Sequence, residues 1–239
     1  MSAELAGRRI VTTRDAPGPL DARLAELGAA VVHVPMIEIV DPPDDRLPMT
    51  LRRLGEFDWV VVSSRHGARR LAPALALHPG VRVAAVGSVT AESLGTDVTP
   101  LVPPRQTAAD LVRAFPPPSA RGRALVVQGD RSDSVVVDGL RALGYDVEAV
   151  VAYLTRGAEP TEAHRRSIEG ADAVVFASGS AATAWYGAFG DDPSLVVVAI
   201  GPTTARVAVA AGLHVDAVAA DHSVDGLVDC VRTVLSGNS

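Results

Sequence analysis

The sequence predicts an α/β protein built from open, mainly parallel sheets, and two observations lead to this prediction. Short apolar, β-branched segments alternate with segments of helical periodicity along the whole chain. The same order of segments then occurs a second time, which indicates two copies of one α/β unit. A chain of 239 residues is long enough to form two domains of ordinary size.

The predicted strands are short runs rich in valine, alanine and isoleucine. They lie at residues 9–12, 30–34, 59–62, 81–86, 124–127, 147–153, 173–176, 196–200 and 215–218. Most are separated by helical segments such as LDARLAELG and VDGLRALG, which end at Gly28 and Gly144. Glycine is typical of the left-handed position that follows a helix. Proline-rich segments at 41–48, 100–104 and 116–118 are predicted loops.

Two segments each occur twice. Segment X begins at Gly7, as GRRIVTTRDAPGPLDARLAELGAAVVHVPMIEI, and at Gly122, as GRALVVQGDRSDSVVVDGLRALGYDVEAVVAYLT. Segment Y runs from FDWVVVSSRHGARRL through VRVAAVGSVTAESLG to QTAADLV, and again from ADAVVFASGSAATAW through VVVAIGPTTARVAVAAG to HSVDGLV. The order X–Y–X–Y permits a tandem pair of domains, or an arrangement in which the first X joins the last Y. The spacing alone does not choose between them.

Composition excludes several classes of function. The basic residues are 22 arginines with no lysine, so a P-loop lysine, a lysine Schiff base and pyridoxal phosphate chemistry are excluded. A net charge of −6 and 4% aromatic residues argue against nucleic acid as a partner. The apolar runs are far shorter than the roughly 20 residues of a membrane span. The N-terminus lacks a signal-peptide pattern, so we expect a cytoplasmic protein.

Metal and redox sites also have little support in the sequence. The single cysteine, Cys230, cannot form an internal disulfide, and we expect a buried structural thiol on a terminal helix. The six histidines never stand four residues apart and have no cysteine nearby, so we expect no metal site. Neither G-x-G-x-x-G nor G-x-S-x-G occurs after a strand.

Small hydroxyl residues and glycines follow six predicted strands. In open α/β sheets, ligands bind at the carboxyl ends of the strands, where free helix N–H groups attract anions. Serine and threonine are also ordinary N-caps, but six such loops together favour an anion-binding site. No pair of carboxylates stands there, so chemistry based on positioning a reactive polyanion fits best. The residues are Thr12, Thr13 and Arg14; Ser63, Ser64 and Arg65; Gly87, Ser88 and Thr90; Gly129, Asp130 and Arg131; Ser178, Gly179 and Ser180; and Gly201, Thr203 and Thr204.

These segments, taken in order, resemble the uroporphyrinogen-III synthase family from about Ile10 to Leu235. The resemblance rests on DWVVVSSRHGARRL, AVGSVTAESLG, ALVVQGDRSDSVVVDGLRALGYDVEAVVAYLT, DAVVFASGSAATAW and AIGPTTARVAVAAGL. It implies two similar flavodoxin-like domains, each with an open parallel sheet, joined by a two-stranded linker. One domain would comprise residues 1–35 plus 156–239 and the other residues 39–152, with linker strands near 36–38 and 153–155. The active site would be the cleft between them.

The resemblance also implies a reaction. The family cyclises hydroxymethylbilane, a linear tetrapyrrole with many carboxylates, with loss of water, inversion of the last pyrrole ring and no cofactor. Tyr153 matches the family tyrosine proposed to assist departure of the hydroxyl. Thr90, Thr203, Thr204, Ser63 and Ser178, and the loop from Gly129 to Ser132, match positions that face the cleft. Further candidates for substrate binding at the strand ends are Thr13, Ser64, Arg65, Gly87, Gly179, and, within that loop, Asp130 and Arg131.

This chain departs from the family pattern after one strand, where Ser63 and Ser64 are followed by Arg65-His66-Gly67 in place of Asn-Gly. Arg65 could bind a substrate carboxylate in a bidentate fork, or point into solvent. The alternative function is a non-catalytic two-domain module that binds a small anionic ligand. A sugar-phosphate or nucleotide transferase would need a carboxylate or metal pair. We expect a monomer, and the sequence leaves open whether the preceding pathway enzyme delivers the substrate directly.

Overall fold

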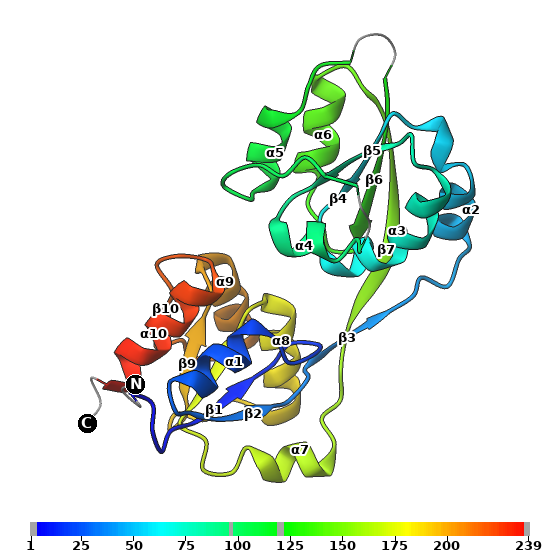
Figure 1. Cartoon of the computed structure of the whole chain (residues 1–239). Helices are drawn as coiled ribbons and strands as arrows, with labels where there is room; N and C mark the ends of the chain where they lie inside the picture. The colour runs from blue at the N-terminus through cyan, green and yellow to red at the C-terminus, as the bar shows by residue number, and fades with distance from the viewer. Residues whose placement is uncertain (1–3, 96–97, 119–121, 237–239) are drawn as a thin grey trace. The chain divides into compact units, whose positions relative to one another are not determined.

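A computed structural model of the chain describes residues 4–95, 98–118 and 122–236. The chain forms two compact units, shown in Figure 1. The first unit comprises Met1–Glu38 and Arg156–Ser239, and the second comprises Ile39–Thr155. The outer ends of the predicted domain ranges, residues 1 and 239, lie outside the described residues.

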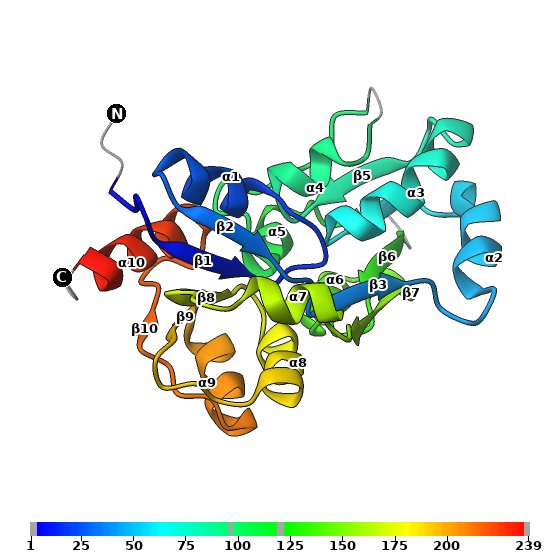
Figure 2. The same cartoon turned by 90° about the horizontal axis from the view of Figure 1, so that it is seen from below.

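The first unit contains a five-stranded sheet in the order β10-β9-β8-β1-β2. All of these pairings are parallel. Parallel strands need crossover connections, which place helices on both faces of a sheet. In Figure 2, α1 and α10 cover one face and α8 and α9 cover the other. The elements are β1 (Arg9–Thr12), α1 (Pro19–Glu26), β2 (Ala30–His33), α7 (Glu162–Ser167), β8 (Ala173–Phe176), α8 (Gly179–Phe189), β9 (Val196–Ala199), α9 (Pro202–Ala211), β10 (Ala217–Val218) and α10 (Val224–Ser236).

The second unit contains a five-stranded sheet in the order β3-β7-β6-β4-β5. β4 pairs in parallel with β5 and β6, and β6 pairs in parallel with β7. The elements are β3 (Ile37–Val40), α2 (Arg46–Arg52), the short 3-10 helix η1 (Leu54–Glu56), β4 (Trp59–Val62), α3 (Arg65–Leu77), β5 (Arg82–Ala85), α4 (Ser88–Glu92), α5 (Ala108–Ala114), β6 (Arg123–Gly129), α6 (Val135–Ala142) and β7 (Asp146–Gly157).

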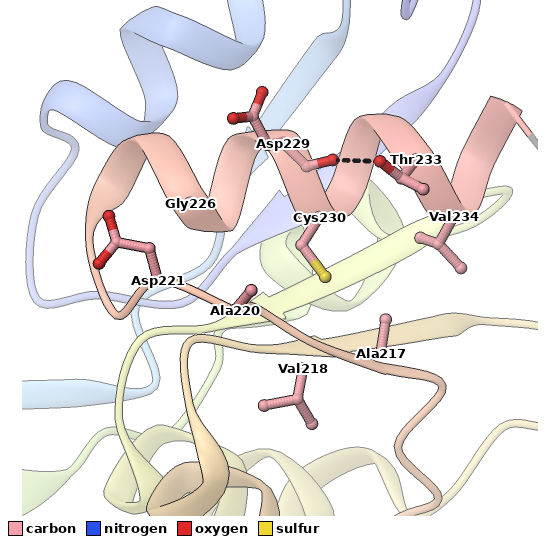
Figure 3. A pocket seen from close by; sticks show the side chains of 9 residues that line it. All are labelled: Ala217, Val218, Ala220, Asp221, Gly226, Asp229, Cys230, Thr233 and Val234. Carbon is pink, nitrogen blue, oxygen red and sulfur yellow. Dashed lines mark hydrogen bonds between the residues drawn. The ribbon is translucent and has the colours of Figure 1, made fainter.

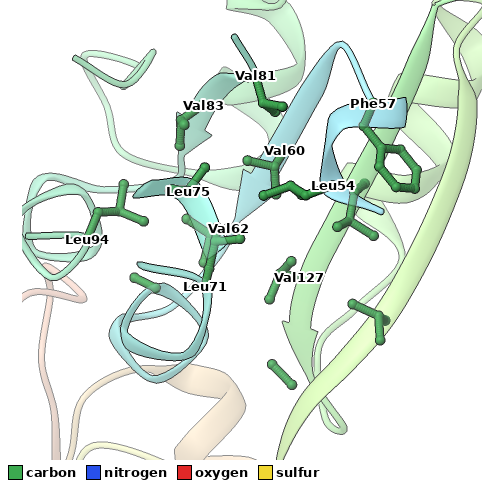
Figure 4. Packing of buried hydrophobic residues seen from close by; sticks show 14 of the residues in the cluster. Leu54, Phe57, Val60, Val62, Leu71, Leu75, Val81, Val83, Leu94 and Val127 are labelled. Atoms are coloured by element: carbon green, nitrogen blue, oxygen red, sulfur yellow. The ribbon is translucent and has the colours of Figure 1, made fainter. Parts of the chain in front are cut away.

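The sheet of the second unit is buried on both faces. Successive side chains of a strand point to opposite faces, and β4 follows this rule. Val60 and Val62 belong to one buried cluster, which Figure 4 shows together with Leu71 of α3. Trp59 and Val61 belong to another cluster, which includes residues of α5 and α6. A strand buried on both faces reads as a continuous apolar run, as the sequence WVVV does.

The α/β class predicted from the sequence is confirmed, and the strand pairings in both units are mainly parallel. Gly28 and Gly144 follow α1 and α6 with φ angles of 91° and 98°, so both take the predicted left-handed conformation. The strand predicted at 215–218 is shorter in the structure, where β10 contains only Ala217–Val218. None of the helices in the described ranges is long and apolar enough to cross a bilayer.

The sheets combine segments that are far apart in the sequence. β1 and β2 come from the first copy of segment X, and they share a sheet with β8 and β9 from the last copy of segment Y. β3 contains both Glu38 and Ile39, and β7 contains both Thr155 and Arg156, so these two strands continue across the boundary between the units. The strand predicted at 147–153 is longer in the structure, where β7 runs from Asp146 to Gly157.

Candidate active site

Four connections at the carboxyl ends of the strands have the same length. β4, β5, β8 and β9 are each followed, after two loop residues, by the first residue of α3, α4, α8 and α9. The second loop residues are Ser64, Gly87, Ser178 and Gly201, and each is the N-cap of its helix. The first-turn N–H groups of these helices therefore lie at the strand ends, where the sequence analysis expects ligands.

Two of these loops end in a serine that caps the helix. The Ser64 hydroxyl accepts a hydrogen bond from the Gly67 N–H at 3.2 Å, and Ser178 accepts one from the Ala181 N–H at 3.3 Å. A cap of this kind stabilises a protein by about 1 kcal/mol. These two candidates for substrate binding thus also have a structural role.

The other two loops end in a glycine, so α4 and α9 have no side-chain cap of their own. A threonine is the third residue of each helix, and both are buried: Thr90 is 8% exposed and Thr204 is 7% exposed. Neither threonine hydroxyl forms a hydrogen bond within the described residues, whereas Thr12, Thr13 and Thr50, which are also buried, each do. Thr90 and Thr204 are thus the buried threonines with a hydroxyl available to a ligand.

Threonine is an ordinary N-cap, and Thr203 and Thr204 both stand near the start of α9. Gly201 occupies the N-cap position with an extended backbone, so neither threonine is the cap. Thr203 is exposed, and Pro202 is the first residue of α9 and lacks an N–H. The N–H groups of Thr203 and Thr204 are therefore the donors that the first turn presents.

The hydroxyl of Thr13 has an internal partner. Thr13 is fully buried, and its Oγ1 donates a hydrogen bond of 2.9 Å to the carbonyl oxygen of Val175 in β8. Its neighbour Thr12 donates from Oγ1 to Asp21 Oδ1 at 2.5 Å. Both hydroxyls thus join elements of the first unit, and we assign Thr13 a structural role in place of the predicted contact with substrate.

Gly179 has a packing role. A Cβ atom on this residue of α8 would lie 2.8 Å from Val207 Cβ and Cγ1 in α9, closer than two nonbonded carbon atoms approach. The glycine therefore lets two helices of the first unit pack closely. This packing role accounts for the glycine at position 179 without any contact to a ligand.

Tyr153 lies beside the end of β6, in register with Gly129. A Cβ atom at Gly129 would lie 2.7 Å from both Cζ and Oη of Tyr153. Only glycine leaves room for the phenol against the backbone here. The Asp130 N–H donates to the Tyr153 carbonyl at 3.1 Å, and Asp130 Oδ1 accepts from the Thr155 N–H at 2.9 Å. The loop that contains Gly129 is therefore tied to the strand that contains Tyr153.

Two residues of α3 that were not predicted from the sequence also contact Tyr153. The His66 ring centroid is 5.3 Å from the Tyr153 ring centroid, and the Arg70 guanidinium is 5.8 Å from it. Arg70 is held by Asp41, since its Nε donates to Asp41 Oδ1 at 2.8 Å. The spacing of four residues between His66 and Arg70, which places both on one face of a helix, is the signal that could have identified them.

The remaining candidates differ in their surroundings. Ser63 is half-buried, and its hydroxyl has no hydrogen-bond partner within the described residues. Arg65 Nε donates to His66 Nε2 at 3.3 Å, so Arg65 lies next to the ring that contacts Tyr153. Arg131 is exposed.

Several groups with displaced pKa values lie at the opposite, amino ends of the strands. The hydrogen bond from Arg123 lowers the pKa of Glu56 ahead of β4. Burial raises the pKa of Tyr145 ahead of β7. Burial lowers the pKa of His214 ahead of β10, but Asp191, the Leu195 carbonyl and Asp216 together raise it by more. These shifts belong to ion pairs and packing that hold the sheets together.

A pocket of about 510 Å³ lies in the first unit, between α10 and the segment that contains β10 (Figure 3). Cys230 points into it, and burial raises the pKa of the thiol. The cysteine is half-buried, so it is more accessible than the buried structural thiol that the sequence predicts. This pocket is lined by residues of α10 and of the segment around β10, not by the four loops described above. Within the described ranges, no three His, Cys, Asp or Glu side chains are grouped to hold a metal ion.

The comparison with protein families decides the classification. The model of the family described as uroporphyrinogen-III synthase HemD matches residues 18–229, which is most of the chain. The chain belongs to the uroporphyrinogen-III synthase family. The resemblance seen in segments X and Y is thereby confirmed.

Two curated relatives of the uroporphyrinogen-III synthase family are similar in sequence. Uroporphyrinogen-III synthase of Synechococcus elongatus is 32% identical over 167 residues, which cover 64% of this chain and 62% of that protein. The porphyrin biosynthesis protein HemD of Ruminiclostridium josui is 25% identical over an alignment 259 residues long, which covers 100% of this chain and 51% of that protein. The chain thus spans less than two thirds of the length of both relatives.

A solved structure supports the fold. The crystal structure of uroporphyrinogen-III synthetase from Helicobacter pylori 26695 is similar with a TM-score of 0.68 and 17% sequence identity. The similarity covers 96% of this chain and 99% of that chain. At this level of identity the likeness concerns the fold, which it shares over nearly the whole length.

Proposed function

We propose that this chain is a uroporphyrinogen-III synthase, a cyclising lyase of porphyrin and haem biosynthesis. It would convert hydroxymethylbilane into uroporphyrinogen III and water, inverting the last pyrrole ring. The observation that carries this proposal is the family match over residues 18–229. The named relative of Synechococcus elongatus supports it.

The chemistry of the candidate site fits such a reaction. Loss of the hydroxyl from hydroxymethylbilane leaves an azafulvene, which closes through a spiro intermediate and then rearranges. Without an enzyme, the linear molecule closes head to tail and forms the type I isomer. The catalyst must hold the chain in the less favoured conformation, and this is a matter of positioning many carboxylates. Hydroxyls and helix N–H groups at the strand ends are suited to that task.

Tyr153 is the group that we assign to the departing hydroxyl. Its phenol can donate a hydrogen bond to the leaving oxygen, which becomes water. The contact with Gly129 fixes the position of Oη, and the ring lies beside His66 and Arg70. A fixed phenol loses little entropy when it meets the substrate.

The substrate carboxylates would bind at the hydroxyls and N–H groups that have no partner in the chain. Ser63, Thr90, Thr203 and Thr204 meet this condition within the described residues. A carboxylate at a helix N-terminus is stabilised by about 0.3 to 1 kcal/mol, and by about 2 kcal/mol where it is partly buried. Several such contacts together would distinguish the reactive conformation of a flexible polyanion.

The two compact units are, in this proposal, two flavodoxin-like domains. The first sheet has the strand order 2-1-3-4-5 when its strands are numbered along the chain, which is the flavodoxin order. The second sheet has the same order if β4 is counted first and β3 last. The segments near 36–38 and 153–155, in or next to β3 and β7, would be the linker. We further propose that the protein is a cytoplasmic monomer.

The test supplies the purified chain with freshly generated hydroxymethylbilane, oxidises the products and separates the porphyrin isomers by chromatography. A reaction without protein and one with heat-denatured protein are the controls, and both should give type I porphyrin. We expect mainly type III porphyrin with the native chain. Type I alone would refute the proposal, and a ligand-induced rise in melting temperature without type III would favour the non-catalytic binding module.

A further inference from the structure

Gln106 and His222 occupy equivalent positions in the two copies of segment Y. Gln106 begins QTAADLV and His222 begins HSVDGLV. Each precedes a hydroxyl residue that caps a helix: Thr107 accepts from the Asp110 N–H at 3.1 Å, and Ser223 accepts from the Gly226 N–H at 3.0 Å. The same local structure therefore positions both side chains.

Both side chains lie against the glycine that begins another helix. A Cβ atom at Gly87 would be 3.0 Å from Gln106 Oε1. A Cβ atom at Gly201 would be 2.8 Å from His222 Cδ2 and 3.0 Å from His222 Nε2. Gln106 thus covers the start of α4, and the imidazole of His222 covers the start of α9.

In the first copy, the chain itself closes the helix end. Gln106 Oε1 accepts a hydrogen bond of 2.9 Å from the Ser88 N–H and one of 3.2 Å from the Ser88 hydroxyl. Ser88 is the first residue of α4, so its free N–H already has an acceptor. A ligand carboxylate at the Ser88 N–H would have to displace the amide oxygen of Gln106, whereas the Thr90 hydroxyl has no bond to Gln106.

In the second copy, the equivalent bond cannot form. The first residue of α9 is Pro202, which has no N–H to offer to His222. The His222 ring forms no hydrogen bond or ion pair within the described part of the chain. The nearest acid in sequence, Asp221, accepts from the Ser223 hydroxyl at 2.6 Å. The imidazole is exposed and keeps its ring nitrogens for a ligand.

Thr204 provides a second, independent sign of a ligand at this helix end. It is 7% exposed, and its hydroxyl has no partner within the described residues. Among those residues only Trp59 Nε1 is fully enclosed without a hydrogen bond, so the Thr204 oxygen retains contact with solvent. Thr204 is the third residue of α9, and the Cα–Cβ bonds of a helix tilt toward its N-terminus, so this side chain lies beside the start of α9.

We infer that His222 binds a carboxylate of the substrate at the start of α9, together with the hydroxyl and N–H of Thr204. The imidazole N–H, the hydroxyl and the N–H groups of the first turn are all donors, and the helix dipole adds positive potential. α9 has ten residues, enough to sustain that potential. The identity of the ligand rests on the proposed function. The two copies of segment Y would then differ in role, because Gln106 closes the start of α4 while His222 binds a ligand at the start of α9.

The kinetic test compares three variants with the wild type on hydroxymethylbilane. His222→Ala should raise KM about tenfold and leave kcat nearly unchanged, because a hydrogen bond to a charged group is lost. His222→Gln should restore KM to within about threefold, since its amide can still donate. Gln106→Ala is the matched control from the other copy. It should lower the melting temperature and leave KM within about twofold. An unchanged KM in His222→Ala would overturn the inference.

A binding test separates this inference from the proposed function. Uroporphyrin III, a stable polycarboxylate, is titrated against each folded protein and followed by its fluorescence. His222→Ala should bind it about tenfold more weakly than the wild type, and Gln106→Ala should bind it equally. If the wild type forms no type III isomer, the proposed function fails, and this titration alone decides. Equal affinity of His222→Ala and wild type would overturn the role of His222.

Discussion

The hydroxyl of Tyr153 lies against Gly129, where the Cβ atom of any other residue would overlap it. The ring lies beside Gly129, His66 and Arg70 at the end of β6, and it is partly exposed. Packing alone would require the ring but not its hydroxyl. Replacing tyrosine by phenylalanine at this position removes only the hydroxyl, so it separates a packing role from a functional one.

Tyr153→Phe should lower kcat at least about 100-fold, as expected when a proton donor to the reacting group is lost. The melting temperature should stay the same, because the ring still packs on the cluster around Val62 and Ala152. Steady-state kinetics and thermal unfolding measure both quantities. Tyr186→Phe, at a 40% exposed position of α8, is the control and should behave as the wild type. A normal kcat in Tyr153→Phe would reduce the residue to a packing role.

Thr13 and Thr204 allow the same substitution, threonine to valine, at two kinds of hydroxyl. The Thr13 hydroxyl has a hydrogen-bond partner within the chain, and the Thr204 hydroxyl has none within the described residues. Thr13→Val removes the bond to the Val175 carbonyl and should lower the free energy of unfolding by about 1 kcal/mol. Thr204→Val removes no internal bond, so the protein should be as stable as the wild type while KM rises. Chemical denaturation and kinetics measure the two effects. Loss of stability in Thr204→Val would show that its hydroxyl has an internal partner.

At the scale of elements, the packing of α8 on α9 depends on Gly179. Gly179→Ala should lower the free energy of unfolding by about 1 to 3 kcal/mol, because the new methyl group overlaps Val207. Val207→Ala removes Cγ1 and Cγ2 but keeps Cβ, so the double variant should recover part of the loss. Urea denaturation of the single and double variants gives the coupling. A normally stable Gly179→Ala with a raised KM would instead support the predicted role in substrate binding.

A histidine links the end of α8 to the strands β9 and β10. His214 Nδ1 lies 2.6 Å from Asp191 Oδ1, and its Nε2 lies 3.0 Å from the Leu195 carbonyl oxygen and 3.2 Å from Asp216 Oδ2. Burial lowers the pKa of His214, but Asp191, the Leu195 carbonyl and Asp216 together raise it by more, so the pKa is raised overall. The pKa of Asp191 is lowered, first by the His214 backbone N–H and then by its ring.

These shifts predict how stability depends on pH. The raised pKa of His214 contributes stability that is fully present below the unfolded imidazole pKa of about 6.5 and is lost as the pH rises through the folded pKa. The lowered pKa of Asp191 contributes stability that is lost as the pH falls through its folded pKa. The melting temperatures of the wild type and His214→Gln should therefore differ most in mildly acidic solution and converge as the pH rises. A difference that is constant with pH would contradict this account.

At the scale of the whole molecule, much of the fold follows from the sequence because the two copies of segments X and Y repeat it. β1, β4 and β8 occur within the residues that their apolar runs predict. Gly28 and Gly144 end their helices as expected. Periodicity reports local structure, and here it was sufficient for the class and for most strands.

The candidate site followed from the sequence only in part. The repeat placed Thr90 and Thr204 at equivalent helix ends, but it did not show that Thr13 is satisfied by Val175 or that Gly179 accommodates Val207. Those partners are 162 and 28 residues away, and side-chain partners at such separations depend on the tertiary fold. For the same reason, the contacts of Gln106 with Gly87 and of His222 with Gly201 could not be predicted from the sequence.

Inversion of the last pyrrole ring distinguishes the proposed reaction from spontaneous closure. The most direct measurement supplies hydroxymethylbilane that carries ¹³C in its last ring and records the NMR spectrum of the macrocycle that the wild-type protein releases. We predict that the substituents of the labelled ring are exchanged relative to the order in the linear substrate, as in uroporphyrinogen III. A labelled ring that keeps its original order, as in spontaneous closure, would contradict the account.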